Sequence, residues 1–381
     1  MTLHIFNPEH DIALASGLSN FTAPHAGRQL RHDLGYIPAL WAADGDAILV
    51  DDPEVARRQW LKTVARIEKL TWRHTARNIL FVSSSDSLSV VGTGVTSVDP
   101  WGWDSALTAL LRRRGLSESV LPDEQWLLMV RKLSHRRMAA SVMTQLRNAL
   151  AEDCRQAGMK GVQMADTVDT VVGESFECTT IAEIEPLLAH YGRLVLKSPW
   201  SSSGRGLRFL SVDRTPLKMQ EGWIRNVIAS QGSVMVEPYY NKVKDFGMEF
   251  LADGEGKVSY LGLSLFQTAN GAYSGNILAT ETFKTQSIGR YVSTSLLVLV
   301  RDRLCYILSL LFKDYGYSGP LGVDMMIVRD EGGRLLLHPC VEINLRLTMG
   351  HVALSLSPDD DDVQRVMRID YNENVYRLRI F

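Results

Sequence analysis

Short apolar runs and one amphipathic stretch alternate along the first part of the chain. The runs at 3–6, 47–50 and 79–83 predict strands, and the helical spacing of apolar residues over 53–70 predicts a helix. A rhythm of strand, helix and strand favours a parallel sheet. The chain therefore opens with a predicted α/β unit.

Polar residues that follow the first predicted strand are candidate substrate contacts. Ligands of doubly wound sheets bind just beyond the carboxyl ends of the strands, and Asn7, His10 and Asp11 stand at that position. The same residues also suit a capped turn, in which Asn7 and Pro8 stop the strand and Asp11 starts a helix. The pattern leaves both interpretations open.

The middle of the chain changes character twice. A stretch rich in Ser, Gly and Trp between about residues 84 and 122 predicts a domain boundary with a helix inside it, and a helical pattern follows over 124–150. From residue 170 onward strands follow one another with little helix between them, which indicates antiparallel pairing. The predicted strands lie at 170–176, 193–197, 233–240, 247–253, 258–266, 322–328 and 335–344, and the predicted helices at 180–191 and 291–314.

The composition is that of a soluble globular protein. The 381 residues are 45% hydrophobic and 22% charged, and a chain of this length usually divides into roughly two or three domains. The formal net charge of −2 provides no global attraction to nucleic acid or to a membrane, so an anionic ligand must be held locally. The N-terminus lacks the pattern of a signal peptide, and no apolar stretch reaches the length of a bilayer span. We therefore expect a cytoplasmic protein without nucleic-acid or membrane partners.

One segment combines a lysine, serines and glycines in a way that suits a polyphosphate. Residues 194–210, LVLKSPWSSSGRGLRFL, place Lys197 at the end of an apolar strand and a polar turn directly after it. Glycines allow backbone N–H groups to point toward one spot, serines add hydroxyl donors, and the lysine adds a positive charge. An ordinary turn between strands has the same composition, and Lys197 would then extend to solvent from an edge strand.

Three oxygen-bearing side chains on two later strands predict a cation site. Asp324 lies within the apolar run 322–328, and Glu342 and Asn344, two residues apart in another strand, share one face. Such groups are costly to bury unpaired, and Mg²⁺ binds carboxylate and amide oxygens while sharing its other positions with substrate phosphates. If the strand persists beyond Asn344, Arg346 would lie on the same face and meet a phosphate oxygen. The alternative is a structural network of salt bridges.

Four short motifs, taken in their order along the chain, resemble those of the ATP-grasp superfamily. KSPWSSSGRG matches its lysine-ended strand and glycine-rich loop, VMVEPYY its adenine hinge, GVDMM its strand-borne aspartate, and EINLRLTMGH its Glu-x-Asn-x-Arg motif. The resemblance covers about residues 125–355. Leu345 stands where many members have proline, and Pro238 follows the hinge glutamate where a basic residue is frequent. Neither departure removes a ligand.

The resemblance implies an α/β and α+β architecture in which a two-lobed ATP-grasp fold follows an N-terminal α/β domain. Residues 1–122 would form the N-terminal domain, which would contribute to acceptor binding. Residues 123–235 would form the lobe with the lysine-ended strand and the glycine-rich loop. Residues 236–381 would form the lobe with the adenine hinge, the metal-binding strands and a C-terminal extension.

The resemblance also implies a role for each matching residue. Lys197 would contact the α- and β-phosphates, and Arg346 would stabilise the transferred phosphoryl group. Arg136 or Lys132, in a basic cluster that would otherwise be a solvated helix face, would reach the nucleotide. The loop over the triphosphate would comprise Ser201, Ser202, Ser203, Gly204, Arg205 and Gly206, the adenine hinge Glu237, Tyr239 and Tyr240, and the magnesium site Asp324, Glu342 and Asn344. Mn²⁺ would be a substitute for Mg²⁺.

The implied activity is that of an Mg·ATP-dependent ligase. ATP-grasp ligases phosphorylate a carboxylate, and an amine or similar nucleophile then attacks the acyl phosphate. We therefore expect small-molecule or peptide substrates, a carbon–nitrogen bond as the product and a chain able to form a homodimer. The alternatives are a small-molecule kinase of the same fold and a nucleotide-binding regulatory protein without activity.

Acceptor contacts are expected in one polar stretch between apolar strands. Residues 266–279 would form a hairpin, and its donors would be Gln267, Asn270, Tyr273 and Asn276. A mobile surface loop has the same composition. His351, just after the arginine motif, would either line the site or cap the following helix.

Overall fold

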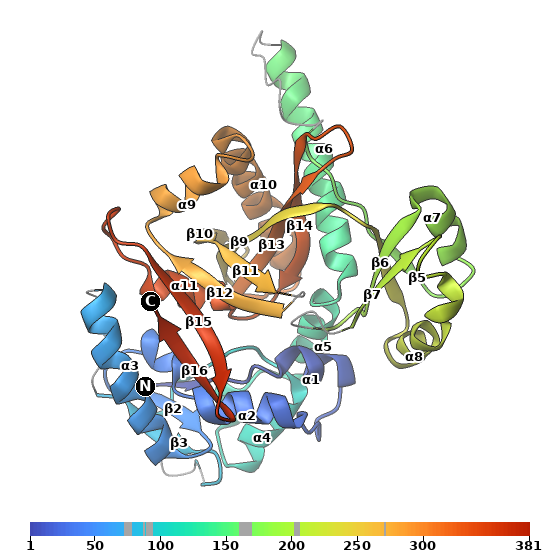
Figure 1. Cartoon of the computed structure of the whole chain (residues 1–381). Coiled ribbons are helices and arrows are strands. Elements are labelled where there is room, and N and C mark those ends of the chain that lie inside the picture. Colours follow the sequence, from blue (N-terminus) through green and yellow to red (C-terminus); the bar gives the residue numbers. More distant parts are fainter. Residues whose placement is uncertain (72–77, 87, 89–93, 160–169, 202–205, 270–271) are drawn as a thin grey trace.

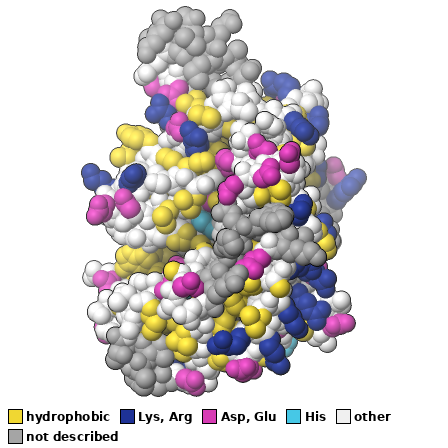
Figure 2. Space-filling model, turned by 90° about the vertical axis from the view of Figure 1, so that its left-hand side faces the viewer, with side chains coloured by type: hydrophobic (Ala, Val, Ile, Leu, Met, Phe, Trp, Pro, Cys, Tyr) yellow, Lys and Arg dark blue, Asp and Glu magenta, His cyan; other side chains and the backbone are white. Residues whose placement is uncertain are grey.

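The computed structural model describes residues 1–71, 78–86, 88, 94–159, 170–201, 206–269 and 272–381. Within this part of the chain there are four sheets of four strands each, and helices pack against them (Figure 1). Figure 2 shows basic and acidic side chains on the same face, as expected from the small net charge. In the described residues, no helix is both long enough and apolar enough to cross a membrane.

The N-terminal sheet is parallel, as predicted, and its strand order is β3-β2-β1-β4. The strands are β1 (Thr2–Ile5), β2 (Ala47–Val50), β3 (Leu80–Ser83) and β4 (Ser97–Pro100). The helices of this unit are α1 (His10–Ser16), α2 (His25–Leu34), α3 (Pro53–Thr71) and α4 (Ser105–Arg113), with 3-10 turns at Ile37–Leu40 and Glu118–Val120. The stretch predicted as a domain boundary thus supplies the fourth strand of this sheet.

The second sheet carries the lysine-ended strand. Its order is β5-β8-β6-β7, and its described pairings are antiparallel. The strands are β5 (Phe176–Cys178), β6 (Arg193–Lys197), β7 (Leu207–Ser211) and β8 (Val234–Pro238), covered by α7 (Ile184–Tyr191) and α8 (Glu221–Gln231), with a 3-10 turn at Leu217–Met219. Leu194 and Leu196 of β6 pack into the core of this lobe, so alternation brings Lys197 to the strand end on the opposite face.

The strand predicted over 170–176 is wrong for most of its length. Val171 makes only an isolated bridge with Leu337, and regular pairing starts at Phe176. Gly173 explains the difference, because its φ of +135° is one that L side chains rarely adopt. A Cβ at Gly173 would also lie 2.7 Å from Cε1 of His338.

The single helix predicted over 124–150 is two helices, α5 (Glu124–Leu133) and α6 (Arg137–Met159). The hydroxyl of Ser134 donates to Val130 O at 2.8 Å, a local bond that competes with helix continuation. The backbone N–H of Arg136 then donates to Pro199 O at 3.2 Å instead of to its own helix. This break places Arg136 in a turn that faces the end of β6.

The third sheet forms the larger lobe and carries the predicted metal-binding strands. Its antiparallel order is β10-β9-β13-β14. The strands are β9 (Lys242–Asp253), β10 (Val258–Ser264), β13 (Ser318–Arg329) and β14 (Leu335–Asn344), and the neighbouring helices are α9 (Glu281–Ile288) and α10 (Thr294–Lys313). Helices α6 and α10 pack on this sheet, and their buried apolar side chains form one core with it. The antiparallel pairing predicted for this half of the chain is confirmed.

The fourth sheet joins the predicted hairpin to the C-terminal strands. The strands are β11 (Phe266–Ala269), β12 (Ala272–Leu278), β15 (Arg365–Asn372) and β16 (Val375–Ile380), and α11 (Met349–Leu356) precedes β15. Strand β16 packs on α2 and α3 of the N-terminal unit, and the guanidinium of Arg66 donates to Ile380 O at 3.0 Å. The hairpin over 266–279 is confirmed, and the C-terminal strands tie the two ends of the chain together (Figure 1).

Candidate active site

Lys197 and Glu237 form a buried ion pair at the end of the small-lobe sheet. The Lys197 ammonium lies 2.6 Å from Oε2 of Glu237, and both side chains are under 10% exposed. The pair forms because β6 and β8 are neighbours in register, with Val195 opposite Glu237. A buried pair of this kind leaves a costly unpaired charge if one partner is removed. Lys197 therefore does not extend to solvent from an edge strand.

Arg136 connects the two lobes. Its guanidinium lies 2.8 Å from Oε2 of Glu342 on β14 and donates to Ser198 O at 3.0 Å and to Ser201 Oγ at 3.2 Å. The Arg136 side chain is 8% exposed. Burial alone would lower its pKa, but the carboxylates of Glu342, Glu237 and Asp11 together raise it. Arg136 thus carries a fixed positive charge beside the loop predicted to bind phosphates.

The predicted metal ligands meet on adjacent strands. Asp324 and Glu342 are directly opposite in the β13–β14 register, and Gly322 is opposite Asn344. The Asn344 amide donates to Oδ2 of Asp324 at 3.2 Å. Burial, followed by the nearby carboxylates of Glu342 and Glu249, raises the pKa of Asp324 well above its ordinary range. Two acidic groups in this proximity repel each other unless a proton or a cation lies between them.

Arg346 continues this cluster and joins it to the N-terminal unit. Its guanidinium donates to both carboxylate oxygens of Asp11, at 2.8 to 3.1 Å, and to Oδ1 of Asn344 at 2.9 Å. Burial would raise the pKa of Asp11, but the positive charge of Arg346, with a smaller contribution from Arg136, holds that pKa below its ordinary value. The structure therefore pairs Asp11, a candidate substrate contact, with Arg346, which was expected to contact the transferred phosphoryl group.

Glu249 is a buried carboxyl beside the site that the sequence analysis missed. It is 3% exposed on β9 and accepts a hydrogen bond from Thr348 Oγ1 at 2.9 Å, while Nδ1 of His351 lies 3.1 Å away. Burial raises its pKa to about 7. A Cβ at Gly322 or Gly350 would clash with its carboxylate, so these two glycines make room for it. The charged residue within the apolar run GMEFLAD was the available signal.

The oxygen donors fit a hard divalent cation. Asp324 and Glu342 offer carboxylates and Asn344 an amide, and a cation there would relieve the repulsion between the two acids. In the described residues, no group of three or more His, Cys, Asp or Glu side chains is placed to hold a metal ion. Besides the two carboxylates, the ligands of a Mg²⁺ ion would therefore be the amide oxygen of Asn344, water and phosphate oxygens.

The remaining residues that were predicted to bind the nucleotide make contacts of several kinds. Lys132 is exposed on α5, and its ammonium lies over the ring of Tyr315, so Arg136 is the basic residue that reaches the cluster. Tyr239 follows β8 with the Arg193 guanidinium over its ring, and Tyr240 packs edge-on against His338. Gly206 lies at the end of the loop, where Ser198 N donates to its carbonyl. Ser202, Ser203, Gly204 and Arg205 lie outside the described residues.

The residues predicted after the first strand fall into two groups. Asn7 is buried, and its amide donates to Gly102 O at 2.8 Å and to Asp104 at 3.2 Å; His10 lies 3.4 Å from the same carboxylate. The chain leaves β1 at Ile5 and enters α1 at His10 without a side-chain cap, and these two side chains bond to the segment between β4 and α4. Asp11 instead points to Arg346.

The predicted acceptor residues are spread along the hairpin. Asn276 is 1% exposed, donates to Ser264 Oγ at 2.9 Å and accepts from the hydroxyl of Tyr273. Gln267 is exposed on β11, and Asn270 lies outside the described residues. His351 caps α11, as the structural alternative expects, and also contacts Glu249; burial lowers its pKa to about 4.

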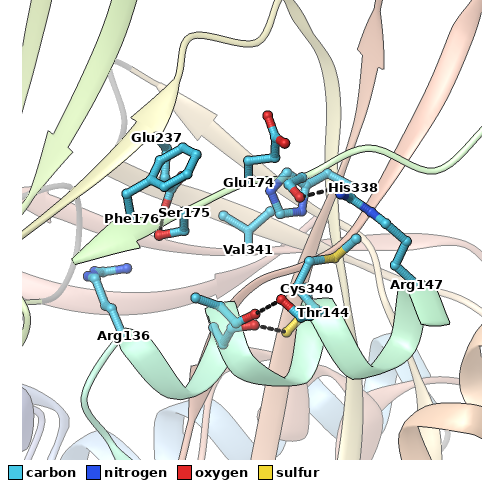
Figure 3. A pocket seen from close by; sticks show the side chains of 14 residues that line it. Arg136, Thr144, Arg147, Glu174, Ser175, Phe176, Glu237, His338, Cys340 and Val341 are labelled. Carbon is cyan, nitrogen blue, oxygen red and sulfur yellow. Dashed lines mark hydrogen bonds between the residues drawn. The ribbon is translucent and has the colours of Figure 1, made fainter. Parts of the chain in front are cut away.

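A small cavity of about 170 Å³ opens beside Arg136 and Glu237 (Figure 3). Helix α6 forms its floor, and the segment before β5 and the edge strand β14 form its other walls. Its lining residues are Arg136, Ala139, Ala140, Met143, Thr144, Arg147, Gly173, Glu174, Ser175, Phe176, Glu237, His338, Cys340 and Val341. The cavity therefore continues from the charged cluster into the space between the lobes.

Comparison with known proteins supports the fold. No family model and no curated protein matches the sequence. Among solved structures, N5-carboxyaminoimidazole synthetase from Staphylococcus aureus, complexed with ADP, is similar over 98% of this chain and 83% of that one, with a TM-score of 0.50 and 11% identity. A biotin carboxylase from Campylobacter jejuni matches over 98% and 77%, with a TM-score of 0.48 and 13% identity.

The fold of this chain is the ATP-grasp fold. The Staphylococcus aureus likeness covers nearly the whole chain, including the N-terminal α/β unit. The two antiparallel lobes, the lysine-ended strand and the paired acidic strands have the order that the sequence resemblance implies. At 11% identity, the similarity to this structure shows the fold alone, and the function has to be argued from the residues of the site.

Proposed function

We propose that this chain is an Mg·ATP-dependent ligase that phosphorylates a carboxylate and joins the activated acyl group to an amine or similar nucleophile. The substrates would be small molecules or peptides. One observation carries the proposal. Buried and partly buried polar groups from both lobes and from the N-terminal unit meet in one cluster. Its charged members are Lys197, Glu237, Arg136, Glu342, Asp324, Arg346 and Asp11, and the amide of Asn344 lies among them.

The cations of this cluster suit a polyphosphate. Lys197 and Arg136 are held in place by the carboxylates of Glu237 and Glu342, which lowers the entropic cost of fixing them on a ligand. Arg136 lies in the turn between α5 and α6 and contacts Ser198 of the small lobe and Glu342 of the large lobe, so one triphosphate bound by Lys197 and Arg136 would lie between the lobes. In phosphoryl transfer the protein acts mainly by positioning and by neutralising charge, and this cluster provides both.

The acidic side of the cluster would hold Mg²⁺. Asp324, Glu342 and Asn344 supply its protein oxygens, and the bound ion would offset negative charge on the phosphates and on the acyl oxygens. Arg346 uses several of its N–H groups on Asp11, Asn344 and Leu347 O, so it would orient this edge of the site as well as face the transferred group.

The proposal is tested by trapping its intermediate. Purified protein with Mg·ATP and a panel of carboxylic acids should release ADP, and added hydroxylamine should convert the acyl phosphate into a hydroxamate. ADP release with a phosphorylated alcohol and no hydroxamate would instead support a kinase. Folded protein that binds Mg·ATP but turns over no acceptor would support the regulatory alternative.

A further inference from the structure

A groove of about 630 Å³ follows strand β4 at the junction of the N-terminal unit and the large lobe. One wall is the strand and its continuation, over 96–103, and the opposite wall is formed by 119–123 and by the start of β13. Arg346 also lines it. Its volume lies within the roughly 300–1,000 Å³ of pockets for whole ligands, and it shares no lining residue with the cavity beside Glu237.

The outer edge of β4 carries backbone groups that face this groove. The strand order β3-β2-β1-β4 leaves β4 at the edge, and within the described residues no strand pairs with its outer side. Thr96 N donates to Met1 O, so by alternation residues 96 and 98 turn toward β1 and Ser97 and Asp99 turn outward. Such outward N–H and C=O groups are a template for pairing with another extended chain.

The open part of this edge ends at Trp101. The backbone N–H of Leu347 donates to Trp101 O at 2.8 Å, so the segment after β14 takes the place beside the strand there. A chain that lies along the edge from Ser97 must therefore stop beside Arg346. From Ser97 to Trp101 the strand measures about 13 Å at roughly 3.3 Å per residue, which is the length of about three or four extended residues.

Arg346 has a donor left for a ligand at this end. Its Nε and Nη2 donate to Asp11 and Asn344, and its Nη1 donates to Leu347 O at 3.1 Å. A guanidinium has five N–H groups, so within the described part of the chain one N–H of Nη1 has no acceptor. The guanidinium also lies close enough to Tyr317, another lining residue, to oppose the larger effect of burial, which raises the pKa of the phenol.

The other lining residues suit a peptide better than a phosphate-bearing ligand. Asp99 and Asp123 would repel phosphates and attract an ammonium group. Trp126 and Tyr317 stack with their ring centroids 6.1 Å apart and give the groove an apolar wall. A short peptide carries an ammonium group, a carboxylate and apolar side chains, and therefore matches all three features.

We propose that the acceptor of this ligase is a short peptide that lies along β4 as an added parallel strand, with its C-terminal carboxylate at Arg346. The peptide residue beside Val98 donates its N–H to Ser97 O and accepts from Asp99 N, the pairing of main-chain groups by which extended peptides bind sheet edges. A carboxylate oxygen takes the γ-phosphoryl group of ATP and ADP leaves; an amine then attacks the acyl carbon and phosphate leaves. The inference rests on the proposed function, because it names the carboxylate that is activated there.

Equilibrium dialysis with a pool of unblocked tripeptides tests this assignment. The pool is randomised at every position and dialysed against the protein with Mg·AMP-PNP, and the retained peptides are measured by mass spectrometry. Two comparison pools carry C-terminal amides or N-methylated peptide bonds. Both should bind at least tenfold more weakly, because the first lacks the carboxylate for Arg346 and the second lacks N–H donors for the edge of β4.

A variant that fills the groove provides the second test. Ser119→Trp, at an exposed lining position, should weaken retention of the unblocked pool at least tenfold and leave the affinity for AMP-PNP unchanged. The matched control is Glu118→Trp, exposed in the same turn but paired with Arg112 and absent from the lining, which should change neither.

The outcomes separate this inference from the proposed function. Equal binding of either comparison pool, unchanged retention by Ser119→Trp, or no retention of tripeptides by protein that binds Mg·AMP-PNP overturns the peptide assignment, while the proposed function survives. Folded protein that binds neither tripeptides nor AMP-PNP overturns both.

Discussion

Among single residues, Glu342 connects the two halves of the site. Its carboxylate is opposite Asp324 and paired with Arg136, so it contacts both the predicted metal site and the predicted phosphate site. It is also one of the few charged groups here that lie partly open to solvent, with a side chain 24% exposed. A substitution at this position removes the carboxylate partner of Arg136 and also the repulsion between Glu342 and Asp324, so its two effects on stability oppose each other.

Glu342→Gln should reduce Mg·ATP turnover by at least a hundredfold and leave the fold intact. The change removes one metal-binding charge and almost no volume, and loss of a charged contact in a phosphoryl-transfer site typically costs orders of magnitude in rate. ADP release and the thermal unfolding midpoint are measured together. Glu331→Gln, exposed in the turn between β13 and β14, is the matched control. Full activity in Glu342→Gln would contradict the metal assignment.

Glu249 makes the stability of the ligand-free protein depend on pH. Its pKa of about 7 lies above the value of a solvated glutamate, so the folded state binds the proton more tightly than the unfolded state. The contribution of Glu249 to stability is therefore fully present below the unfolded pKa of 4.5 and is lost as the pH rises through the folded pKa of about 7. Glu249→Gln removes this contribution, which is on the order of 3 kcal/mol for a fully buried carboxyl.

Urea unfolding at pH 5.5 and pH 8 measures this effect. The unaltered protein should lose more free energy of unfolding between the two pH values than Glu249→Gln does. Thr348→Val, which removes a hydrogen bond to Glu249 without removing the carboxyl, should keep a pH dependence at least as steep. Identical pH profiles for the unaltered protein and Glu249→Gln would show that Glu249 is ionised throughout this range.

At the scale of elements, the segment after β14 joins the lobes to the N-terminal unit. Arg346 pairs with Asp11 at the start of α1, and Leu347 N donates to Trp101 O at 2.8 Å just after β4. Both contacts lie at the carboxyl ends of N-terminal strands, where ligands of α/β sheets bind. The orientation of the N-terminal unit and the geometry of Arg346 are therefore linked.

Asp11→Asn should lower both stability and turnover. The substitution leaves the largely buried Arg346 without its carboxylate, at a cost of about 1–3 kcal/mol. The free energy of unfolding and the kcat for ADP release are the measurements, and Asp86→Asn, exposed in the same N-terminal unit, is the control. A variant with unchanged stability and unchanged kcat would show that the pair does not position Arg346.

Strands bounded by polar residues were the easiest elements to predict from sequence. The strands at 47–50, 193–197 and 335–344 are observed with the predicted bounds. The first two are apolar runs with polar residues at or just beyond their ends, and the third begins as an apolar run and then alternates up to Asn344. The break before α6 was missed, since the bond from Arg136 to Pro199 that ends the helix pattern is tertiary. The C-terminal strands over 365–380 were not predicted, although their apolar and charged residues alternate in part, which is a signal typical of strands.

The site could be predicted as a set of residues but not as a set of pairs. Lys197, Asp324, Glu342, Asn344 and Arg346 were chosen because charged groups at the ends or in the middle of apolar strands need partners. Which partner each one takes depends on the fold. Asp11 and Arg346 are 335 residues apart in sequence, and no local pattern connects them.

In the whole molecule, three units close around one charged cluster. The small lobe supplies Lys197 and Glu237, the large lobe Asp324 and Glu342, and the N-terminal unit Asp11. The C-terminal strands β15 and β16 pack on the N-terminal helices and connect them to the hairpin of the large lobe (Figure 1). The expected homodimer stays a prediction, since the structure contains one chain.

The most direct test of the central claim is calorimetry of the unaltered protein with AMP-PNP, with and without Mg²⁺. We predict one binding site per chain and an affinity at least tenfold higher with Mg²⁺, because the ion relieves the repulsion between Asp324 and Glu342. The dependence on Mg²⁺ should disappear in Glu342→Gln. A folded protein that binds no nucleotide in either condition, or binds it equally in both, would contradict the assignment of this cluster as an Mg·ATP site.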